Sequence, residues 1–361
     1  MNRREFLRGA GAVSAGLALS GGSRLPAFAP DASWRTFEVV SDIEVLRPSG
    51  ISRVWLPVPS RAAAPYQTST APDTFAAPGG KARMAVDSRT GATMIVAEWP
   101  AGAKPTLTVS SRVSTRDHAI DLTAPGRMKP ASKSELARFL QPTSMLPTDG
   151  IVQKTALSIT ANSKTDLDKA RAIYDWIVEN THREPTVRGC GIGDIRFMLE
   201  SNDLGGKCAD LNALYVGLAR AAGLPARDVY GIRIAKSQLG YKSLGTSSEV
   251  ISTSQHCRAE VYLTAYGWTP VDPADVRKVM LEEPPGNLPM TDEKVTAARS
   301  RLFGSWEMNW MAYNTAHDVA LPGSTGKALP FLMYPQAETG GARLDSLDPD
   351  GFRYKITSRE V

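Results

Sequence analysis

One stretch constrains the fold of this 361-residue chain more than any other. Between Leu211 and Ala222, apolar residues recur at the spacing of one helical face. Gly223 follows where a left-handed residue often closes a helix, and Pro225 then stops it from continuing. Residues 205–207, Gly-Gly-Lys, come directly before Cys208. The sequence therefore predicts an amphipathic helix with Cys208 at its N-terminus.

The predicted position of Cys208 favours a nucleophile. A thiol reacts as the thiolate, and a free cysteine has a pKa near ~8.5. The unpaired N–H groups at a helix start carry partial positive charge and stabilise an anion, and Lys207 adds a cation next to it. The alternative is a small apolar residue packed at a helix start, because free cysteines are usually buried.

A histidine and an aspartate complete a set that could activate Cys208. His256 lies in residues 255–263, which read as a strand, and Asp272 lies near the end of a second predicted strand at 267–275. A nucleophile needs a base, and the base needs a residue that orients it. Surface or helix-end positions are expected for the other histidines, His118, His182 and His317.

The hairpin that holds these two residues has a testable register. Opposed residues in an antiparallel pair share a face, and faces alternate along each strand. His256 and Asp272 are both even-numbered, so they share a face only if paired residue numbers add to an even value. The sequence thus predicts an odd-length loop around 264–266, or an even one compensated by a bulge.

These motifs together resemble the transglutaminase-like superfamily of papain-type enzymes, here in a bacterial, exported form. The resemblance covers roughly residues 165–280, and it includes Arg-Ala-Ala-Gly-Leu-Pro-Ala-Arg at 220–227 and Gly-Trp-Thr-Pro-Val-Asp-Pro at 267–273. It implies that Cys208 is the nucleophile, His256 the base and Asp272 the orienting residue. Many members have a tryptophan where this chain has Arg258, which predicts a more polar substrate groove beside the histidine.

The predicted fold class is α+β, with an N-terminal β-sandwich followed by a transglutaminase-like domain. Short strands with turn signals between them indicate the sandwich. The expected divisions are a twin-arginine signal peptide at 1–29, the sandwich at 30–116, a helical connector at 117–164, the catalytic domain at 165–300 and a C-terminal extension packed on the core at 301–361. Within that extension, Trp306 and Trp310 are expected in the core.

The N-terminus accounts for most of the excess charge. The net charge is +5, yet residues 1–29 hold four Arg and one Glu, and the rest has 38 basic and 36 acidic residues. This balance gives little support for nucleic-acid binding. Paired arginines at 3–4, a short apolar segment and Ala27-Phe28-Ala29 are typical of a cleavable twin-arginine signal. We expect a periplasmic mature protein that begins near Pro30, with no membrane span.

Three cysteines leave one pairing question open. If two of them form a disulfide, Cys190 with Cys257 is the pairing that spares Cys208; alternatively Cys257 is a core residue and Cys190 a turn residue. The glycine-rich run at 189–194 lacks the Lys-Ser/Thr of a phosphate loop. No Cys/His cluster has the spacing of a zinc site, so neither a metal nor a cofactor is expected.

The function that these features favour is acyl transfer through a Cys208 thioester. The acyl group would come from a peptide or protein substrate, with hydrolysis of a peptide or amide bond in the cell envelope as the expected outcome. Two alternatives stay open: a transglutaminase that cross-links proteins, and a non-catalytic scaffold that keeps the fold for binding.

Overall fold

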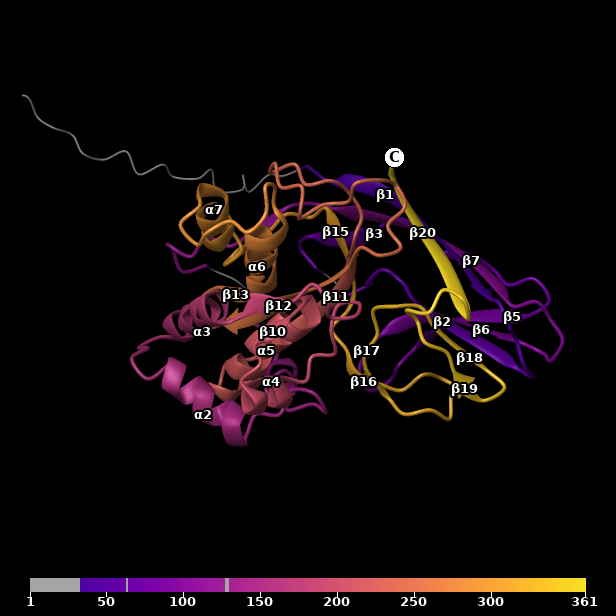
Figure 1. The fold of residues 1–361 in the computed structure, drawn as a ribbon, viewed down its shortest axis with the longest axis horizontal. Helices are drawn as coiled ribbons and strands as arrows, with labels where there is room; N and C mark the ends of the chain where they lie inside the picture. Colours follow the sequence, from indigo (N-terminus) through magenta and orange to yellow (C-terminus); the bar gives the residue numbers. More distant parts are fainter. Residues whose placement is uncertain (1–32, 63, 127–129) are drawn as a thin grey trace, which may run out of the picture.

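The fold, seen in a computed structural model that describes residues 33–62, 64–126 and 130–361, is α+β. Figure 1 shows the β-sandwich on the right, the helices on the left, and a central sheet between them. The predicted signal peptide lies outside the described residues. Within the described parts of the chain, no helix is long and apolar enough to cross a membrane.

The sandwich consists of two antiparallel sheets. The first has the order β20-β1-β7-β3, with β4 also paired to β7, and the second has the order β19-β18-β2-β6-β5. Their strands are β1 (Arg35–Val45), β2 (Ser52–Pro57), β3 (Gln67–Ser69), β4 (Thr74–Ala76), β5 (Lys81–Val86), β6 (Thr93–Trp99), β7 (Thr106–Thr115), β18 (Gln336–Thr339), β19 (Ala342–Arg343) and β20 (Phe352–Glu360).

The two ends of the chain meet in this sandwich. Strand β20 pairs with β1 from Phe37↔Glu360 to Val45↔Phe352, and β18 pairs with β2. Figure 1 shows β20, in yellow, running beside the indigo β1. The region 301–361, expected as an extension, therefore supplies strands to both sheets of the sandwich.

The central sheet has the order β13-β12-β11-β15. Its strands are β11 (Ala226–Arg233), β12 (Gln255–Leu263), β13 (Gly267–Val271) and β15 (Trp310–Asn314). Residues Ala259↔Val271 and Leu263↔Gly267 pair between β12 and β13, so paired numbers add to an even value across a three-residue loop. This confirms the predicted hairpin register.

Helices cover this sheet, and short strand pairs connect its loops. The helices are α1 (Lys133–Arg138), α2 (Gly150–Ile159), α3 (Asp166–Asn180), α4 (Ile195–Ser201), α5 (Cys208–Ala221), α6 (Pro273–Glu282) and α7 (Glu293–Arg301). The short pairs are β8 (His118–Ala119) with β14 (Ser305–Trp306), β9 (His182–Arg183) with β10 (Gly205–Gly206), and β16 (His317–Val319) with β17 (Leu329–Phe331).

The strand expected at 267–275 is wrong beyond Val271. Asp272 is instead the N-cap of α6: its side chain accepts a hydrogen bond from the Asp275 N–H, and Pro273 takes the first helical position. An aspartate followed by a proline is a common helix start. The sequence therefore carried the signal for this helix.

Two apolar clusters fix the position of the site. One packs α3, α5 and α6 against β12, with Leu214, Tyr215 and Val261 among its buried members. The other joins the sandwich to the central sheet, where Phe37 of β1 and Ile232 of β11 belong to one buried cluster. The end of α5 that carries Cys208 is thus held between the two parts of the molecule.

Candidate active site

Helix α5 begins at Cys208, as the sequence predicts. The first N–H groups of a helix have no acceptor within the helix. The Ala209 N–H donates to the carbonyl of Cys190, at 2.9 Å, whereas the Cys208 N–H belongs to the first residue of the helix. Cys208 is only 4% exposed.

Asp210 ties the glycine-rich loop to the start of α5. Its carboxylate accepts hydrogen bonds from the N–H groups of Ile192 (3.0 Å), Gly193 (2.9 Å) and Lys207 (2.9 Å). Gly191, with φ +90°, must be glycine here, because a Cβ would lie 1.8 Å from the Asp210 carboxylate. This loop therefore holds Cys190 next to Cys208.

All three cysteines are free thiols and they meet at Cys208. Hydrogen bonds from the thiols of Cys190 and Cys257, and one from His256, hold the pKa of Cys208 well below its usual value, although burial acts in the opposite direction. The Cys190 thiol also contacts the carbonyl of Gln255, at 3.2 Å. Burial and the contact with Cys208 raise the pKa of Cys257. The contact with Cys208 and burial raise the pKa of Cys190 as well. The arrangement favours a thiolate at Cys208 alone.

The hairpin and α6 bring His256 and Asp272 together. His256 Nε2 lies 2.7 Å from Asp272 Oδ2, both side chains are buried, and the other ring nitrogen is left for Cys208. Asp272 Oδ1 accepts from the Asp275 N–H and from the Asn212 amide, each at 3.1 Å. The three predicted site residues thus form one constellation.

Sequence reasoning missed Asn212, which lies one helical turn after Cys208. Its amide nitrogen also donates to the carbonyl of Cys257, at 2.8 Å, so it joins α5, β12 and the orienting carboxylate. The signal available in the sequence was an uncharged amide side chain four residues after the candidate nucleophile, one turn along the predicted helix.

Asp275 and Arg233 were also missed, and both act on His256. Burial and the Arg233 charge would lower the pKa of His256, but Asp275 and Asp272 outweigh them, so this pKa is raised. Asp275 lies 3.4 Å from His256 Nε2 and accepts two hydrogen bonds from Arg233, at 2.6 and 2.8 Å. A raised pKa at His256 and a lowered one at Cys208 both favour a thiolate–imidazolium pair.

Arg258 does not line the cleft beside His256, so the predicted contribution of this residue to a polar groove is wrong. Its side chain is 2% exposed, its guanidinium lies 3.6 Å from Asp272 Oδ2, and it stacks over Trp310 at 4.8 Å from the ring centroid. The reason is the strand geometry: Arg258 shares a face with His256, and Trp306 and Trp310 cover it. Arg258 offsets part of the negative charge of Asp272 and Asp275.

His256, Asp272 and Asp275 lie close enough together to hold a metal ion. Their charges are already matched, however, because Arg233 binds Asp275 and Arg258 lies beside Asp272. This donor set fits an imidazolium ion better than a divalent cation.

A cleft of about 470 Å³ is lined by Cys208 and His256 and is here called the Cys208 cleft. Loop 252–255 and His256 form part of its wall, and the C-terminal part of the chain contributes Tyr334, Leu347 and Tyr354. The site therefore lies where the central sheet meets the end of the chain.

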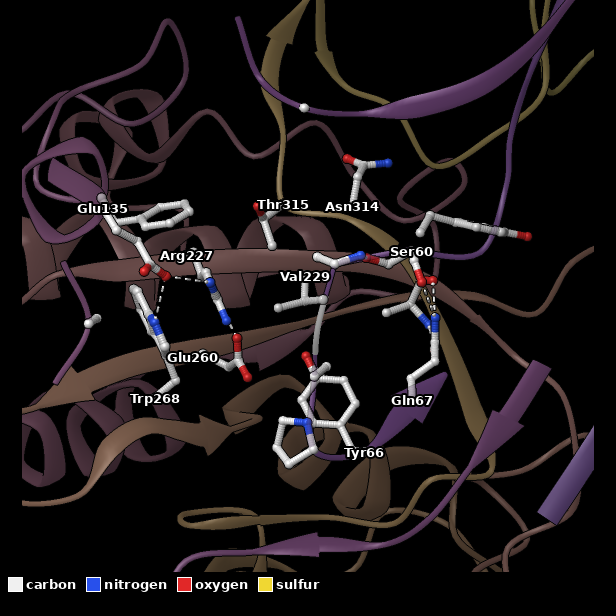
Figure 2. A pocket seen from close by; sticks show the side chains of 18 of the residues that line it. Ser60, Tyr66, Gln67, Glu135, Arg227, Val229, Glu260, Trp268, Asn314 and Thr315 are labelled. Carbon is white, nitrogen blue, oxygen red and sulfur yellow. Dashed lines mark hydrogen bonds and ion pairs between the residues drawn. The ribbon is translucent and has the colours of Figure 1, made fainter. Parts of the chain in front are cut away.

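A second cavity, of about 550 Å³, is here called the Arg227 pocket and is shown in Figure 2. Arg227 lies between two carboxylates, 2.6 Å from Glu260 and 3.6 Å from Glu135, and over the ring of Trp268. The indole N–H of Trp268 donates to Glu135, at 3.0 Å. This pocket has no nucleophilic thiol in its lining among the described residues.

His317 is not at the surface, contrary to expectation. It is 7% exposed and lies 3.1 Å from Asp228, because the segment with β16 packs over β11. His118 is half-buried beside Tyr66. Trp306 and Trp310 are fully buried, as predicted.

Comparisons with known proteins concern the family and the fold. Residues 153–273 match the model of the transglutaminase-like superfamily. An uncharacterized protein of Haemophilus influenzae is 34% identical over 356 residues, which cover 94% of this chain and 95% of that protein. The protein YebA of Bacillus subtilis is 26% identical over 141 residues, 38% of this chain and 19% of its own length.

One solved structure shares the fold across most of the chain. It is the crystal structure of a candidate cysteine protease from Cytophaga hutchinsonii, with a TM-score of 0.57 and 15% identity over 91% of this chain and 92% of that one. At this identity the likeness concerns the fold alone. The matched family model and the relative that aligns along nearly the whole chain show that this protein belongs to the transglutaminase-like superfamily.

Proposed function

We propose that this protein is a cysteine-nucleophile enzyme that hydrolyses a peptide or amide bond through a Cys208 thioester. The observation that carries the proposal is the pair of opposed pKa shifts, lowered at Cys208 and raised at His256, in residues that also hydrogen-bond to each other. Perturbed groups in a cleft are typical of catalytic sites.

The chemistry follows from these contacts. The Cys208 thiolate attacks the carbonyl carbon, and the electron pair of the C=O bond moves to oxygen. Collapse of this intermediate breaks the C–N bond, and the His256 imidazolium gives its proton to the leaving amine. His256 then takes a proton from water, the water oxygen attacks the thioester, and the thiolate leaves. Asp272 orients the imidazole throughout.

Two donors are available for the oxyanion. The Cys208 N–H is the first of α5, where the helix start favours negative charge. The Gln255 side chain lies along the same cleft, and its amide nitrogen is buried with no partner in the described part of the chain. Rotation of this amide toward the substrate oxygen would satisfy it.

Water is the acceptor we propose for the thioester. The Cys208 cleft is open to solvent, and a polar loop at 252–254, Ser-Thr-Ser, forms part of its wall. Cross-linking needs an amine to compete with water at this opening, which the open cleft does not favour.

A direct experiment separates these outcomes. Mature protein is incubated with a digest of envelope proteins and with dansylcadaverine, and the products are sequenced by mass spectrometry. We expect new peptide or amide cleavage products that require Cys208, and little incorporation of the amine. Amine incorporation in excess of cleavage would instead identify a cross-linking transglutaminase.

We also propose export to the periplasm by the twin-arginine route, on the basis of the paired arginines at residues 3 and 4. Replacing both with lysine should leave the precursor in the cytosol in a fractionation experiment. An undiminished amount of mature periplasmic protein would exclude this route.

A further inference from the structure

The walls of the Cys208 cleft carry charge of one sign. Five basic side chains line it, and none of its lining residues among those described is Asp or Glu. The basic residues are Arg183, Arg188, Lys207, Arg233 and Lys278. The Arg227 pocket differs, because Glu135 and Glu260 line it together with its arginines.

Nearby carboxylates neutralise only part of this charge. Arg233 is matched by Asp275, and Arg188 pairs with Asp345. A single carboxylate, Glu282, faces two cations at once, Arg183 and Lys278. Burial lowers the pKa of the Lys278 ammonium group, and the nearby positive charge of Arg233 lowers it further.

Lys207 adds a further positive charge immediately before the nucleophile. No ion pair within 4 Å joins it to a carboxylate in the described residues, although its charge contributes to the lowered pKa of Glu184, whose main cause is a hydrogen bond from Thr186. Within 4 Å, these five cations pair with only three carboxylates of the described chain, Asp275, Asp345 and Glu282, so the ion pairs leave two positive charges of the lining unmatched.

The catalytic groups do not remove this surplus. In the form proposed above, the Cys208 thiolate and the His256 imidazolium balance each other, and Arg258 lies beside Asp272. A concave site lined by one sign of charge concentrates ligands of the opposite sign and raises their rate of association by ~10- to 1,000-fold.

Resting on the proposed function, we propose that the substrate is an acidic peptide, with carboxylate side chains beside the bond that Cys208 attacks. Carboxylates match the guanidinium groups of Arg183 and Arg188 in a bidentate geometry. Lys207 and Lys278 add two point charges to the lining of the same cleft. Recognition of a neutral peptide would leave these charges unmatched when the cleft is covered.

The test uses two rhodamine-labelled peptides of glycine alternating with glutamate or with glutamine, both capped at each end. Binding to mature protein with Cys208→Ala is followed by fluorescence anisotropy. We expect the glutamate peptide to bind at least ~10-fold more tightly at low salt, and this preference to disappear near ~1 M salt, where the Debye length is about 3 Å.

Matched variants locate the effect. Arg188→Gln and Lys207→Gln, each added to the Cys208→Ala protein, should reduce the preference for the glutamate peptide. Arg196→Gln is the control, because Arg196, like Arg188, is an exposed arginine paired with an aspartate, here Asp149, but it does not line the cleft. This control should keep the full preference.

The outcomes separate the two proposals. Equal binding of the two peptides, no binding of either, or an unchanged preference in both Arg188→Gln and Lys207→Gln overturns the acidic-substrate inference. Hydrolysis of the two peptides by wild-type protein is then compared. Equal cleavage would leave the enzyme standing without the charge preference, whereas an acidic preference in binding with no hydrolysis of any peptide would contradict the enzyme and keep the cleft specificity.

Discussion

The two ends of one face of the central sheet contain similar residues and very different chemistry. Along β12, His256, Arg258 and Glu260 share a face because they are two residues apart. At one end His256 meets Asp272. At the other end Glu260 meets Arg227, its directly opposed partner on β11. Arg258 and the tryptophans that cover it separate these two ends.

The ends differ in how their charges are matched. Around Glu260, each charged group has a nearby opposite, and Trp268 and Tyr66 add hydrogen bonds to the two carboxylates. Around His256, the buried carboxylates of Asp272 and Asp275 both lie next to one imidazole. Burial and the charge of Asp275 raise the pKa of Asp272. Only this end has a thiol within hydrogen-bonding reach.

The comparison shows that volume alone does not locate the chemistry. The Arg227 pocket is larger than the Cys208 cleft, at about 550 Å³ against about 470 Å³. Its carboxylates are paired with Arg227, however, and no thiol is among its described lining residues. The smaller cleft is distinguished by a thiol and an imidazole whose pKa values are shifted in opposite directions. Four substitutions test this contrast.

The largest effect is expected at the nucleophile. Cys208→Ala removes the only one of the three thiols whose pKa is lowered; Cys190 and Cys257 lose their contact with Cys208, but burial still raises the pKa of both. Peptide hydrolysis should fall at least ~10³-fold, and rapid alkylation at pH ~6 should disappear from a digest analysed by mass spectrometry. Persistent hydrolysis would place the chemistry elsewhere in the molecule.

The second effect concerns the base. The lowered pKa of Cys208 and the raised pKa of His256 both favour the charged forms, so Cys208 should react with iodoacetamide well below the free-thiol value of ~8.5. His256→Ala removes a hydrogen bond and a positive charge from the thiolate, so its alkylation profile should move to higher pH. The hydrogen bonds from Cys190 and Cys257 remain, so the shift should stop short of a free thiol. An unmoved profile would contradict the ion pair.

A smaller effect is expected at the orienting residue. Asp272→Asn keeps the shape of the side chain but removes one of the two negative charges that raise the pKa of His256; Asp275 still supplies the other. Hydrolysis should decrease less than in His256→Ala, and the upper limb of its pH profile should move to lower pH because the imidazolium loses its proton more easily. A decrease as large as that of His256→Ala would mean that Asp272 does more than orient.

The sequence predicted the parts of the site that depend on local pattern. The helix at Cys208 and the strand at His256 were visible from periodicity, and the shared face of the hairpin followed from counting residues. Each of these features depends on residues close together in the chain.

The rest of the site depends on contacts that pattern does not record. Arg233 meets Asp275 across 42 positions, and Tyr334 reaches the cleft from the end of the chain. Arg258 looked like a groove residue because its burial is determined by Trp306 and Trp310, about 50 positions away. Pairing of β1 with β20 is more distant still, and two strand patterns alone do not specify which strands pair.

The last and smallest effect on reactivity is expected at the other end of the sheet face. Glu260→Gln removes the charge that faces Arg227 in a buried pair, so the free energy of unfolding should decrease by about 3 kcal/mol in urea titrations, the cost typical of leaving a buried charge without its partner. Glu135 remains 3.6 Å from Arg227 and should limit this loss. The alkylation profile of Cys208 should not move, because Glu260 contributes to neither the Cys208 nor the His256 pKa shift among its main causes. Glu98→Gln, which removes an exposed carboxylate paired with Arg53, is the matched control and should change neither quantity appreciably. If Glu260→Gln moved the alkylation profile of Cys208 as His256→Ala is expected to, the two ends of the face would be one coupled site rather than two separate ones.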